Sequence, residues 1–282
     1  ILRKHTGSIY CVSIWYICIN KMQHLVKHKV GICLSGGGAR GVAHIGVLQA
    51  FESAGIFPEI ISGCSAGAMV GALYAAGFNP RDIFKLIEHR SLYSIIKMGL
   101  PDKGMMELAY FKKILTENIE HDSFELLNIP FHVAVTNLNT GNYEIINQGK
   151  LIDYVIASQS IPLVFKPQKI GDYLYVDGGV LNNLPVEPIR DKCEILVGVN
   201  VNPVNYMDKL SGMRDVGCRV LNLSLKMNME HRIKQCDFLI EPPTADFTIF
   251  DINKAKLIYD AGYEAALPVV EQIATLLHNE QT

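Results

Sequence analysis

The chain has 282 residues, of which 49% are hydrophobic and 19% are charged, and its formal net charge is −2 at pH 7. This length suits one large α/β domain or two small ones, and the apolar content supplies a sizeable core, which excludes a disordered protein. A nearly neutral chain without a dense lysine or arginine run gives no electrostatic argument for a nucleic acid partner.

The number and spacing of the cysteines indicate the redox state of the cellular compartment. There are seven, scattered without CxxC spacing, at positions 11, 18, 33, 64, 193, 218 and 236. This odd, irregular set indicates neither a disulfide framework nor a zinc site. We therefore predict a reducing, cytoplasmic location, with at most peripheral contact with a membrane. Because the Asp, His and Cys residues show no ligand spacing, no metal and no cofactor are expected.

The N-terminal residues contain an apolar run at 9–19, preceded by Arg3 and Lys4. The run is too short to span a bilayer, and no small-x-small cleavage site follows it. Because Met22 offers a simpler start, residues 1–21 are expected to be dispensable. We predict that residues 1–27 form an N-terminal extension and that residues 28–282 form one domain.

Two strand-helix units fill the next part of the chain. Residues 29–35 read as a buried strand that runs into the glycine-rich segment 36–41, and a helix is expected at about 42–54. A second strand then enters residues 63–67, which lead into another helix. Two successive units with short connections predict adjacent parallel strands, with both glycine turns at the same carboxyl edge of the sheet.

The remaining elements are expected to extend this sheet and to cover its faces. Helices are expected at about 80–90, 106–119, 150–160, 208–229 and 253–278, and strands at 131–137, 143–146, 165–170, 173–176, 194–200 and 238–240. The apolar segment 91–106 is interpreted as a packed connection, with a lipid-accepting surface as the alternative.

Gly63-Cys64-Ser65-Ala66-Gly67 matches the GxSxG pattern. A sharp strand-to-helix turn leaves no room for side chains beside a nucleophilic serine, and Gly63 and Gly67 provide that room. An ordinary tight turn is the alternative, because an isolated GxSxG is common. Cys64 is expected to fill the core and not to react.

A serine nucleophile also needs fixed donors for the oxyanion that forms when it attacks. Gly36, Gly37 and Gly38 allow backbone amides to turn inward beside a helix N-terminus, so they are the candidate donors. Arg40 in the same loop either braces the loop or contacts the substrate.

The base is expected to be an aspartate. His231 and His278 are the histidines that follow in the order Ser, Asp, His, but neither is expected in a loop after a strand. Asp177, at the end of the second hairpin, is therefore the candidate base for Ser65. A free aspartate has a pKa of about 3.9, so burial would have to raise the pKa of Asp177 for this work.

Three motifs carry a family resemblance: residues 36–41, residues 63–67 and Asp177-Gly178-Gly179, in that order. They resemble the motifs of the patatin-like phospholipases, and residues 157–167 are similar to the family segment before the aspartate hairpin. The resemblance covers roughly residues 29–200. The chain is short, as in a bacterial branch of this family, and it is similar to the catalytic part of the neuropathy target esterase group.

The resemblance implies a patatin-like α/β fold, in which three layers (α/β/α) surround a mainly parallel central sheet. It also implies a lipid acyl hydrolase with a Ser-Asp dyad, whose partner is a lipid ester substrate. By this resemblance Ser65 is the nucleophile and Asp177 the base. The implied oxyanion loop consists of Gly36, Gly37, Gly38 and Arg40.

Other classes of protein fit less well. Gly36, Gly38 and Gly41 satisfy the dinucleotide-binding pattern GxGxxG, but the following strand ends in Ser65 and not in the acidic residue that holds a ribose. A lipid-binding scaffold without activity would not need both Ser65 and Asp177. A thioesterase or peptidase using the same dyad stays open.

Overall fold

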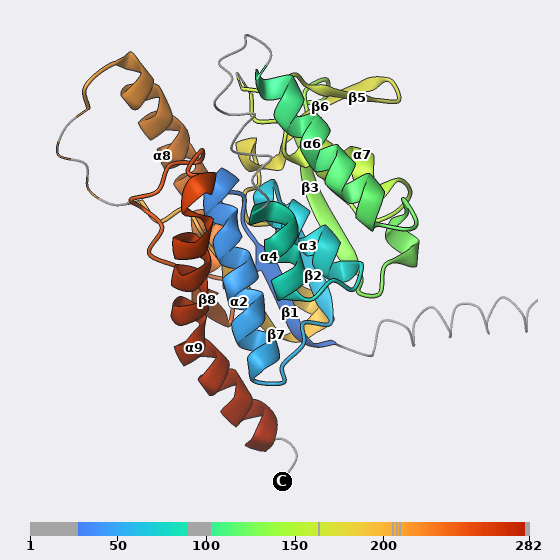
Figure 1. Ribbon diagram of the computed structural model, residues 1–282, viewed down its shortest axis with the longest axis vertical. Coiled ribbons are helices and arrows are strands. Elements are labelled where there is room, and N and C mark those ends of the chain that lie inside the picture. Colours follow the sequence, from blue (N-terminus) through green and yellow to red (C-terminus); the bar gives the residue numbers. More distant parts are fainter. Residues whose placement is uncertain are drawn as a thin grey trace, which may run out of the picture.

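The structure is a computed structural model that describes residues 28–88, 103–162, 164–204, 206, 208 and 210–279 (Figure 1). The expectations for residues 1–27, and for most of the segment 91–106, lie outside the described residues.

An eight-stranded sheet forms the middle of the molecule, in the order β5-β6-β3-β2-β1-β7-β8, with β4 also paired to β3. The strands are β1 (His28–Leu34), β2 (Ile60–Cys64), β3 (Phe131–Asn137), β4 (Asn142–Ile146), β5 (Gln168–Ile170), β6 (Tyr173–Asp177), β7 (Cys193–Val199) and β8 (Phe238–Ile240). Strands β3, β2, β1, β7 and β8 pair in parallel, whereas β4, β5 and β6 pair antiparallel. The sheet is therefore mixed and mainly parallel, as the resemblance implied.

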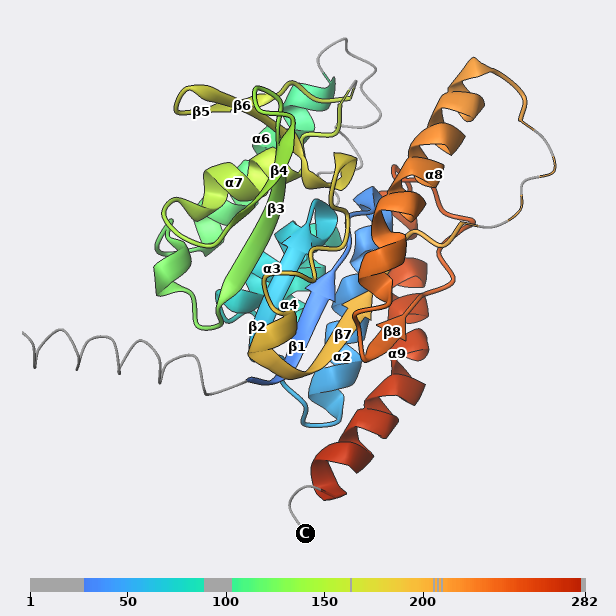
Figure 2. The same cartoon turned by 180° about the vertical axis from the view of Figure 1, so that it is seen from behind.

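Helices cover both faces of this sheet. They are α2 (Val42–Ser53), α3 (Ala66–Ala75), α4 (Pro80–Glu88), α6 (Lys103–Asn118), α7 (Leu151–Ser158), α8 (Met213–Ile233) and α9 (Ala255–Asn279). The views from front and back show α2, α4 and α9 on the front side of the sheet, with α9 beside α2, and α8 behind the sheet (Figures 1 and 2). Among the described helices, none combines the length and the apolar composition that a membrane span requires.

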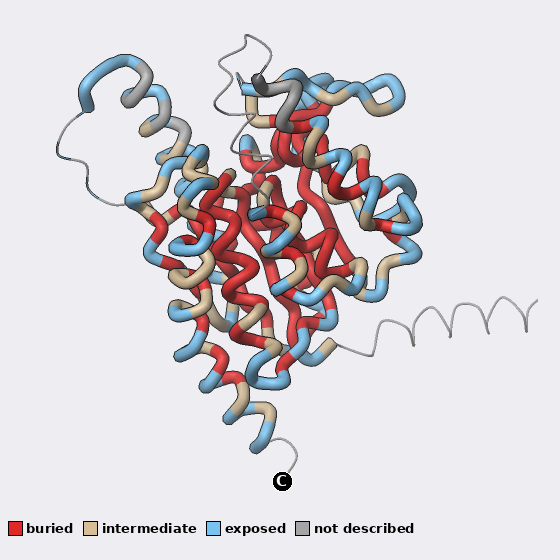
Figure 3. The backbone as a smooth tube through the Cα atoms, viewed as in Figure 1, coloured by how far each residue is buried: buried red, intermediate tan, exposed pale blue. Residues whose placement is uncertain are grey.

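Neighbouring residues of one strand belong to different cores, because side chains alternate across a sheet. Ile32 and Leu34 of β1 belong to the larger core, beneath α2, α3, α7 and α9. Cys33 lies between them in sequence but belongs to a smaller core, which Met229 of α8 completes. The buried residues fill the centre of the molecule (Figure 3). These two cores establish the three-layer α/β/α architecture.

The adjacency expected of the two strand-helix units is confirmed. β1 and β2 pair in parallel, with Leu34 opposite Gly63. The glycine loop that follows β1 and the turn that follows β2 therefore emerge side by side at one edge. Helix α8 begins later than expected, at Met213, because Gly212 before it has an extended backbone.

Helices α2 and α9 approach each other unusually closely, through a glycine on each. A Cβ atom on Gly46 would lie 2.0 Å from the Tyr259 carbonyl oxygen, and one on Gly262 would lie 2.0 Å from the Ala43 carbonyl oxygen. Backbone atoms cannot rotate away as a flexible side chain can, so both positions require glycine. Helix α9 is thereby fitted to the helix that starts at the glycine loop.

Candidate active site

Ser65 lies on a strained turn between β2 and α3. Its φ of 51° and ψ of −121° make it the only non-glycine residue with positive φ in the described part of the chain. Such a conformation costs on the order of 1–3 kcal/mol and persists only where the surroundings enforce it. A Cβ on Gly63 would lie 2.7 Å from the Gly67 carbonyl oxygen, and one on Gly67 would lie 2.3 Å from the Leu34 carbonyl oxygen. The two glycines therefore allow the sharp turn that the sequence predicted.

Ser158, at the end of α7, holds the Ser65 backbone in place. Its hydroxyl oxygen accepts a hydrogen bond from the Ser65 amide at 2.8 Å and donates one to the Ala134 carbonyl oxygen at 2.7 Å. The three groups link α7, β3 and the turn. Sequence reasoning did not single out Ser158, although the segment 157–167 that contains it was noted for its resemblance to the family.

Asp177 reaches Ser65 from the far side of β3. It is the last residue of β6, which pairs with β3, and the Ser65 side chain is among the groups that lower the pKa of its buried carboxyl group. One carboxyl oxygen also accepts a hydrogen bond from the Gly179 amide at 2.7 Å, and the Cys64 thiol lies 3.6 Å from it. The two candidate side chains are thus brought together, and none of these partners of the Asp177 carboxyl group is a histidine.

Burial raises the pKa of the Asp177 carboxyl group from its usual 3.8 to about 6. The cause is desolvation, which disfavours the charged form, while the hydrogen bonds from Ser65, Gly179 and Cys64 act in the opposite direction. This shift brings the pKa of the carboxylate toward neutrality, as a base for serine requires.

No histidine of the described residues is a hydrogen-bond partner of Ser65 or Asp177. His231 and His278 are exposed near the ends of α8 and α9. His44 is buried in α2, where its Nε2 atom lies 2.7 Å from the Ser35 carbonyl oxygen. Burial lowers the pKa of His44 to about 4. His44 is therefore neutral at pH 7 and supports the start of the glycine loop.

The glycine loop after β1 lies directly against Ser65. A Cβ on Gly36 would lie 3.0 Å from the Ser65 Cβ and 2.4 Å from the Asn183 Oδ1, and one on Gly37 would lie 2.4 Å from a methyl group of Val201. Gly38 has a φ of 56°, a conformation that side chains disfavour. The loop can therefore reach the serine only because its residues lack side chains.

The backbone amides of this loop differ in what they bind. The Gly36 amide donates to the Asn183 carbonyl oxygen at 3.2 Å, and the Ala39 amide to the Ile249 carbonyl oxygen at 2.9 Å. Within the described ranges, the amides of Gly37 and Gly38 have no acceptor. Gly36 thus makes room for the serine, while the next two glycines keep free donors.

Asn183 links the glycine loop to the turn that follows Asp177. Its carbonyl oxygen accepts from the Gly36 amide, and its own backbone amide donates to the Asn228 Oδ1 atom of α8 at 3.2 Å. Its Oδ1 atom lies beside both Gly36 and Gly179, where added Cβ atoms would be 2.4 Å and 2.7 Å away. Sequence reasoning missed this residue, and its position six residues after Asp177 was the only available signal.

Arg40 is 5% exposed and lies within the short helix η1 (Gly38–Gly41). Its Nε atom has no hydrogen-bond partner among the described residues, and burial lowers the pKa of the guanidinium. Arg40 does not line the pocket described next. If it braces the loop, it does so by packing.

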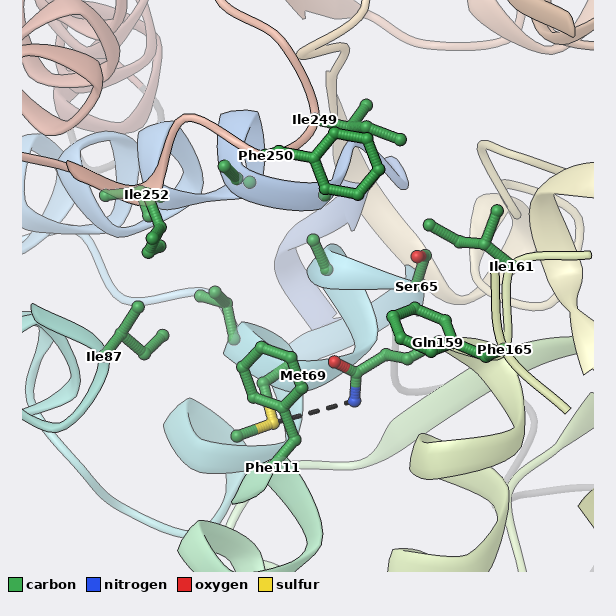
Figure 4. Close-up of a pocket in the computed structure, with 16 residues that line it drawn as sticks. Ser65, Met69, Ile87, Phe111, Gln159, Ile161, Phe165, Ile249, Phe250 and Ile252 are labelled. Atoms are coloured by element: carbon green, nitrogen blue, oxygen red, sulfur yellow. Dashed lines mark hydrogen bonds between the residues drawn. The ribbon is translucent and has the colours of Figure 1, made fainter. Parts of the chain in front are cut away.

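An apolar pocket of about 810 Å³, including its open mouth, begins at Ser65 (Figure 4). It is lined by Gly38, Ala39, Gly41, Val42, Ser65, Ala66, Met69, Val70, Ile87, Phe111, Gln159, Ile161, Phe165, Ile249, Phe250 and Ile252. Among the described residues, only Ser65 and Gln159 contribute polar side chains to this lining. The serine hydroxyl therefore faces a cavity suited to an apolar chain.

These features define the class: an α/β/α protein with a serine on a strand-to-helix elbow, near a buried aspartate. Residues 32–190 match a family model described as patatin-like phospholipase, which is more than half of the 282 residues. The protein belongs to the patatin-like phospholipase family.

Two relatives and one solved structure illustrate the similarity. The chain is 31% identical over 207 residues to Lysophospholipase NTE1 of Cryptococcus neoformans, covering 67% of this chain and 12% of that protein. It is 27% identical over 277 residues to the human patatin-like phospholipase domain-containing protein 6, covering 85% of this chain and 20% of that protein. The crystal structure of VipD from Legionella pneumophila has a TM-score of 0.53 at 16% identity, covering 87% of this chain and 67% of that one.

The solved structure, at 16% identity, supports the fold alone. The similarity to the neuropathy target esterase group is confirmed, whereas the placement in a short bacterial branch stays a prediction. The chain spans about an eighth to a fifth of the length of the two relatives.

Proposed function

We propose that this protein hydrolyses carboxylic ester bonds of lipids through an acyl-Ser65 intermediate. The observation that carries the proposal is Ser65 on its strained elbow at the start of an apolar pocket, with the buried Asp177 carboxyl group close enough for Ser65 to lower its pKa. Such a pocket suits the acyl chain of a lipid, and the hydroxyl at its end suits attack on the ester carbonyl.

In the proposed mechanism, the Asp177 carboxylate takes the Ser65 proton as the hydroxyl oxygen attacks the carbonyl carbon. The negative charge then forms on the carbonyl oxygen, where the free amides of Gly37 and Gly38 are the proposed donors, together with the amide of Ala66 at the start of α3. Protonated Asp177 returns the proton to the leaving alcohol. A water molecule, activated by the same carboxylate, releases the fatty acid.

The substrate class is proposed from the pocket and the relatives together. One relative carries the name lysophospholipase, and a lysophospholipid has one acyl chain, which matches a single apolar pocket. We therefore propose single-chain phospholipids as substrates.

A lipid panel tests this proposal. Purified protein is incubated with a lysophospholipid, a diacyl phospholipid, a triglyceride and an acyl thioester, and released fatty acid is measured. The lysophospholipid is expected to give the highest kcat/KM. A fluorophosphonate should label Ser65, as located by peptide mass spectrometry. Highest turnover of the thioester would assign a thioesterase, and labelling at another residue would overturn the mechanism.

The pKa of Asp177 predicts a pH dependence. Asp177 must be ionised to accept the proton, and its pKa is raised to about 6. We therefore expect kcat/KM for a p-nitrophenyl ester to rise about tenfold per pH unit below pH 6 and to level off above pH 7. A profile with its midpoint near pH 4 would contradict a buried base.

A further inference from the structure

Gln159 is a polar residue in an otherwise apolar pocket. Apart from Ser65, it contributes the only polar side chain to the lining among the described residues. It is 7% exposed, so more than nine-tenths of its surface is withdrawn from water. A polar group that is buried in this way lowers stability unless it finds a hydrogen-bond partner. Each end of the Gln159 amide therefore has to be accounted for.

The amide nitrogen of Gln159 has its partners within the protein. Nε2 donates to the Val155 carbonyl oxygen at 3.3 Å, near the end of α7, and it lies 3.8 Å from the Met69 sulfur of α3. A carbonyl oxygen and a thioether sulfur are both acceptors, so only the NH₂ end of the amide can face them. These two contacts fix which way the amide is turned.

The amide oxygen of Gln159 is directed away from these two partners. Among the described residues, no donor meets the Oε1 atom. Figure 4 shows the nitrogen pointing to the Met69 sulfur and the oxygen pointing to another side, among the side chains that line the pocket. The bond to the end of α7 thus explains the nitrogen of this side chain, but it leaves the oxygen as an acceptor inside the pocket.

The position of Met69 shows how far this acceptor lies from the serine. Met69 is four residues after Ser65, which places it about one helical turn, roughly 5 Å, along α3. Because the Gln159 amide contacts Met69, it lies at about the same depth. Covalent bonds are about 1.5 Å long, so a substrate group at this depth is only a few bonds from the carbonyl carbon that Ser65 attacks.

We propose that the Gln159 Oε1 atom accepts a hydrogen bond from a substrate hydroxyl group that lies a few bonds from the reacting ester carbonyl. A plain acyl chain in the pocket excludes water from this oxygen and gives it no donor, whereas a hydroxyl group supplies one. The inference rests on the proposed function and adds a chemical feature of the substrate to it. Gln159 thereby selects among lipid esters by a group that the reaction leaves unchanged.

Two positions in a lipid ester satisfy this distance. The free glycerol hydroxyl of a lysophospholipid is a few bonds from the carbonyl carbon, and so is a hydroxyl group on the β-carbon of the acyl chain. The first belongs to the leaving alcohol, and the second belongs to the acyl group that stays on Ser65. Both present the same hydrogen-bond donor, so substrates that differ only in one hydroxyl group distinguish the two sources.

Two pairs of substrates test the proposal. The first pair is a lysophosphatidylcholine and its deoxy analogue, which has hydrogen in place of the glycerol hydroxyl. The second pair is the p-nitrophenyl esters of a plain and a β-hydroxylated fatty acid of equal length. In the parent protein, kcat/KM should favour the hydroxylated member of one pair by roughly tenfold or more, the usual cost of a buried acceptor left unpaired. The pair that shows the preference identifies the source of the hydroxyl group.

Gln159→Leu and the unbranched Gln159→Met both remove the amide oxygen, so both should abolish the preference. The matched control is Ser160→Ala. The Ser160 hydroxyl also donates to a carbonyl oxygen near the end of α7, that of Ile156 at 3.0 Å, but Ser160 does not line the pocket. The control should keep the preference. Because the preference is a ratio measured within each variant, a general loss of activity or stability does not change it.

Equal kcat/KM within both pairs in the parent would overturn the proposal. A preference that both Gln159 variants retain, or that Ser160→Ala also loses, would overturn it as well. Calorimetric binding of the same pairs to protein that carries Ser65→Ala measures the contact without turnover, and equal affinities within both pairs would contradict it. A failure of the proposed function appears separately: no substrate is hydrolysed, while the Ser65→Ala protein still binds the hydroxylated lipid more tightly.

Discussion

Replacement of Ser65 by alanine is expected to lower kcat/KM for a p-nitrophenyl ester by about 10⁴-fold or more, to the level that binding and the oxyanion donors alone provide. Alanine removes the nucleophile but little volume. The strained turn is formed by the backbone and by the glycines around it, so the fold should be retained. Single-turnover hydrolysis, with thermal unfolding of the same sample, measures both effects.

Ser160→Ala is the matched control for this variant. Ser160 is also a buried serine near the site, but its hydroxyl donates to the Ile156 carbonyl oxygen of the preceding helix α7 at 3.0 Å. It should keep kcat/KM within a few-fold of the parent. Comparable losses in the two variants would mean that the site is sensitive to any cavity, and hydrolysis that survives Ser65→Ala would exclude Ser65 as the nucleophile.

Replacement of Asp177 by asparagine is expected to lower kcat/KM by about 10³–10⁴-fold and, at pH 8, to stabilise the protein. The carboxyl group binds its proton more tightly when folded, because its pKa rises from 3.8 to about 6. Folding stability therefore falls as pH rises from about 4 to 6, by about 3 kcal/mol in total. Asparagine carries no charge to bury, so it removes this cost.

Thermal unfolding at two pH values checks the sign. At pH 8 the Asp177→Asn variant should unfold roughly 5 °C above the parent, and at pH 4 the difference should vanish, because the parent carboxyl group is then protonated in the folded state. A variant that is less stable than the parent at pH 8 would mean that the hydrogen bonds to Gly179 and Ser65 outweigh the cost of burial.

Much of this fold could be predicted from the sequence, because its strands are continuous apolar runs bounded by glycine turns. The parallel pairing of β1 with β2, and hence the proximity of the glycine loop to Ser65, followed from two short strand-helix units. The proximity of Asp177 to Ser65 did not follow from local pattern. It depends on β6 pairing with β3, and it was anticipated only by setting the histidines aside and by the family resemblance.

Other parts of the site could not be predicted, because their roles arise only in three dimensions. Ser158 and Asn183 are polar residues of an ordinary kind, and their importance lies in contacts with residues distant in sequence, such as Ser65 and Gly36. The extent of the pKa shift of Asp177 likewise depends on how completely the folded chain excludes water.

The close fit of α9 against α2 has a consequence for the boundaries of the domain. The matched family segment ends at residue 190, yet β7, which pairs with β1, and α9, which presses on α2, follow it. Val201 and Ile249, which contact the glycine loop, also follow it. The segment matched by the family model is thus shorter than the folded domain, which extends through α9. A transplant of this activity into another protein must extend through α9.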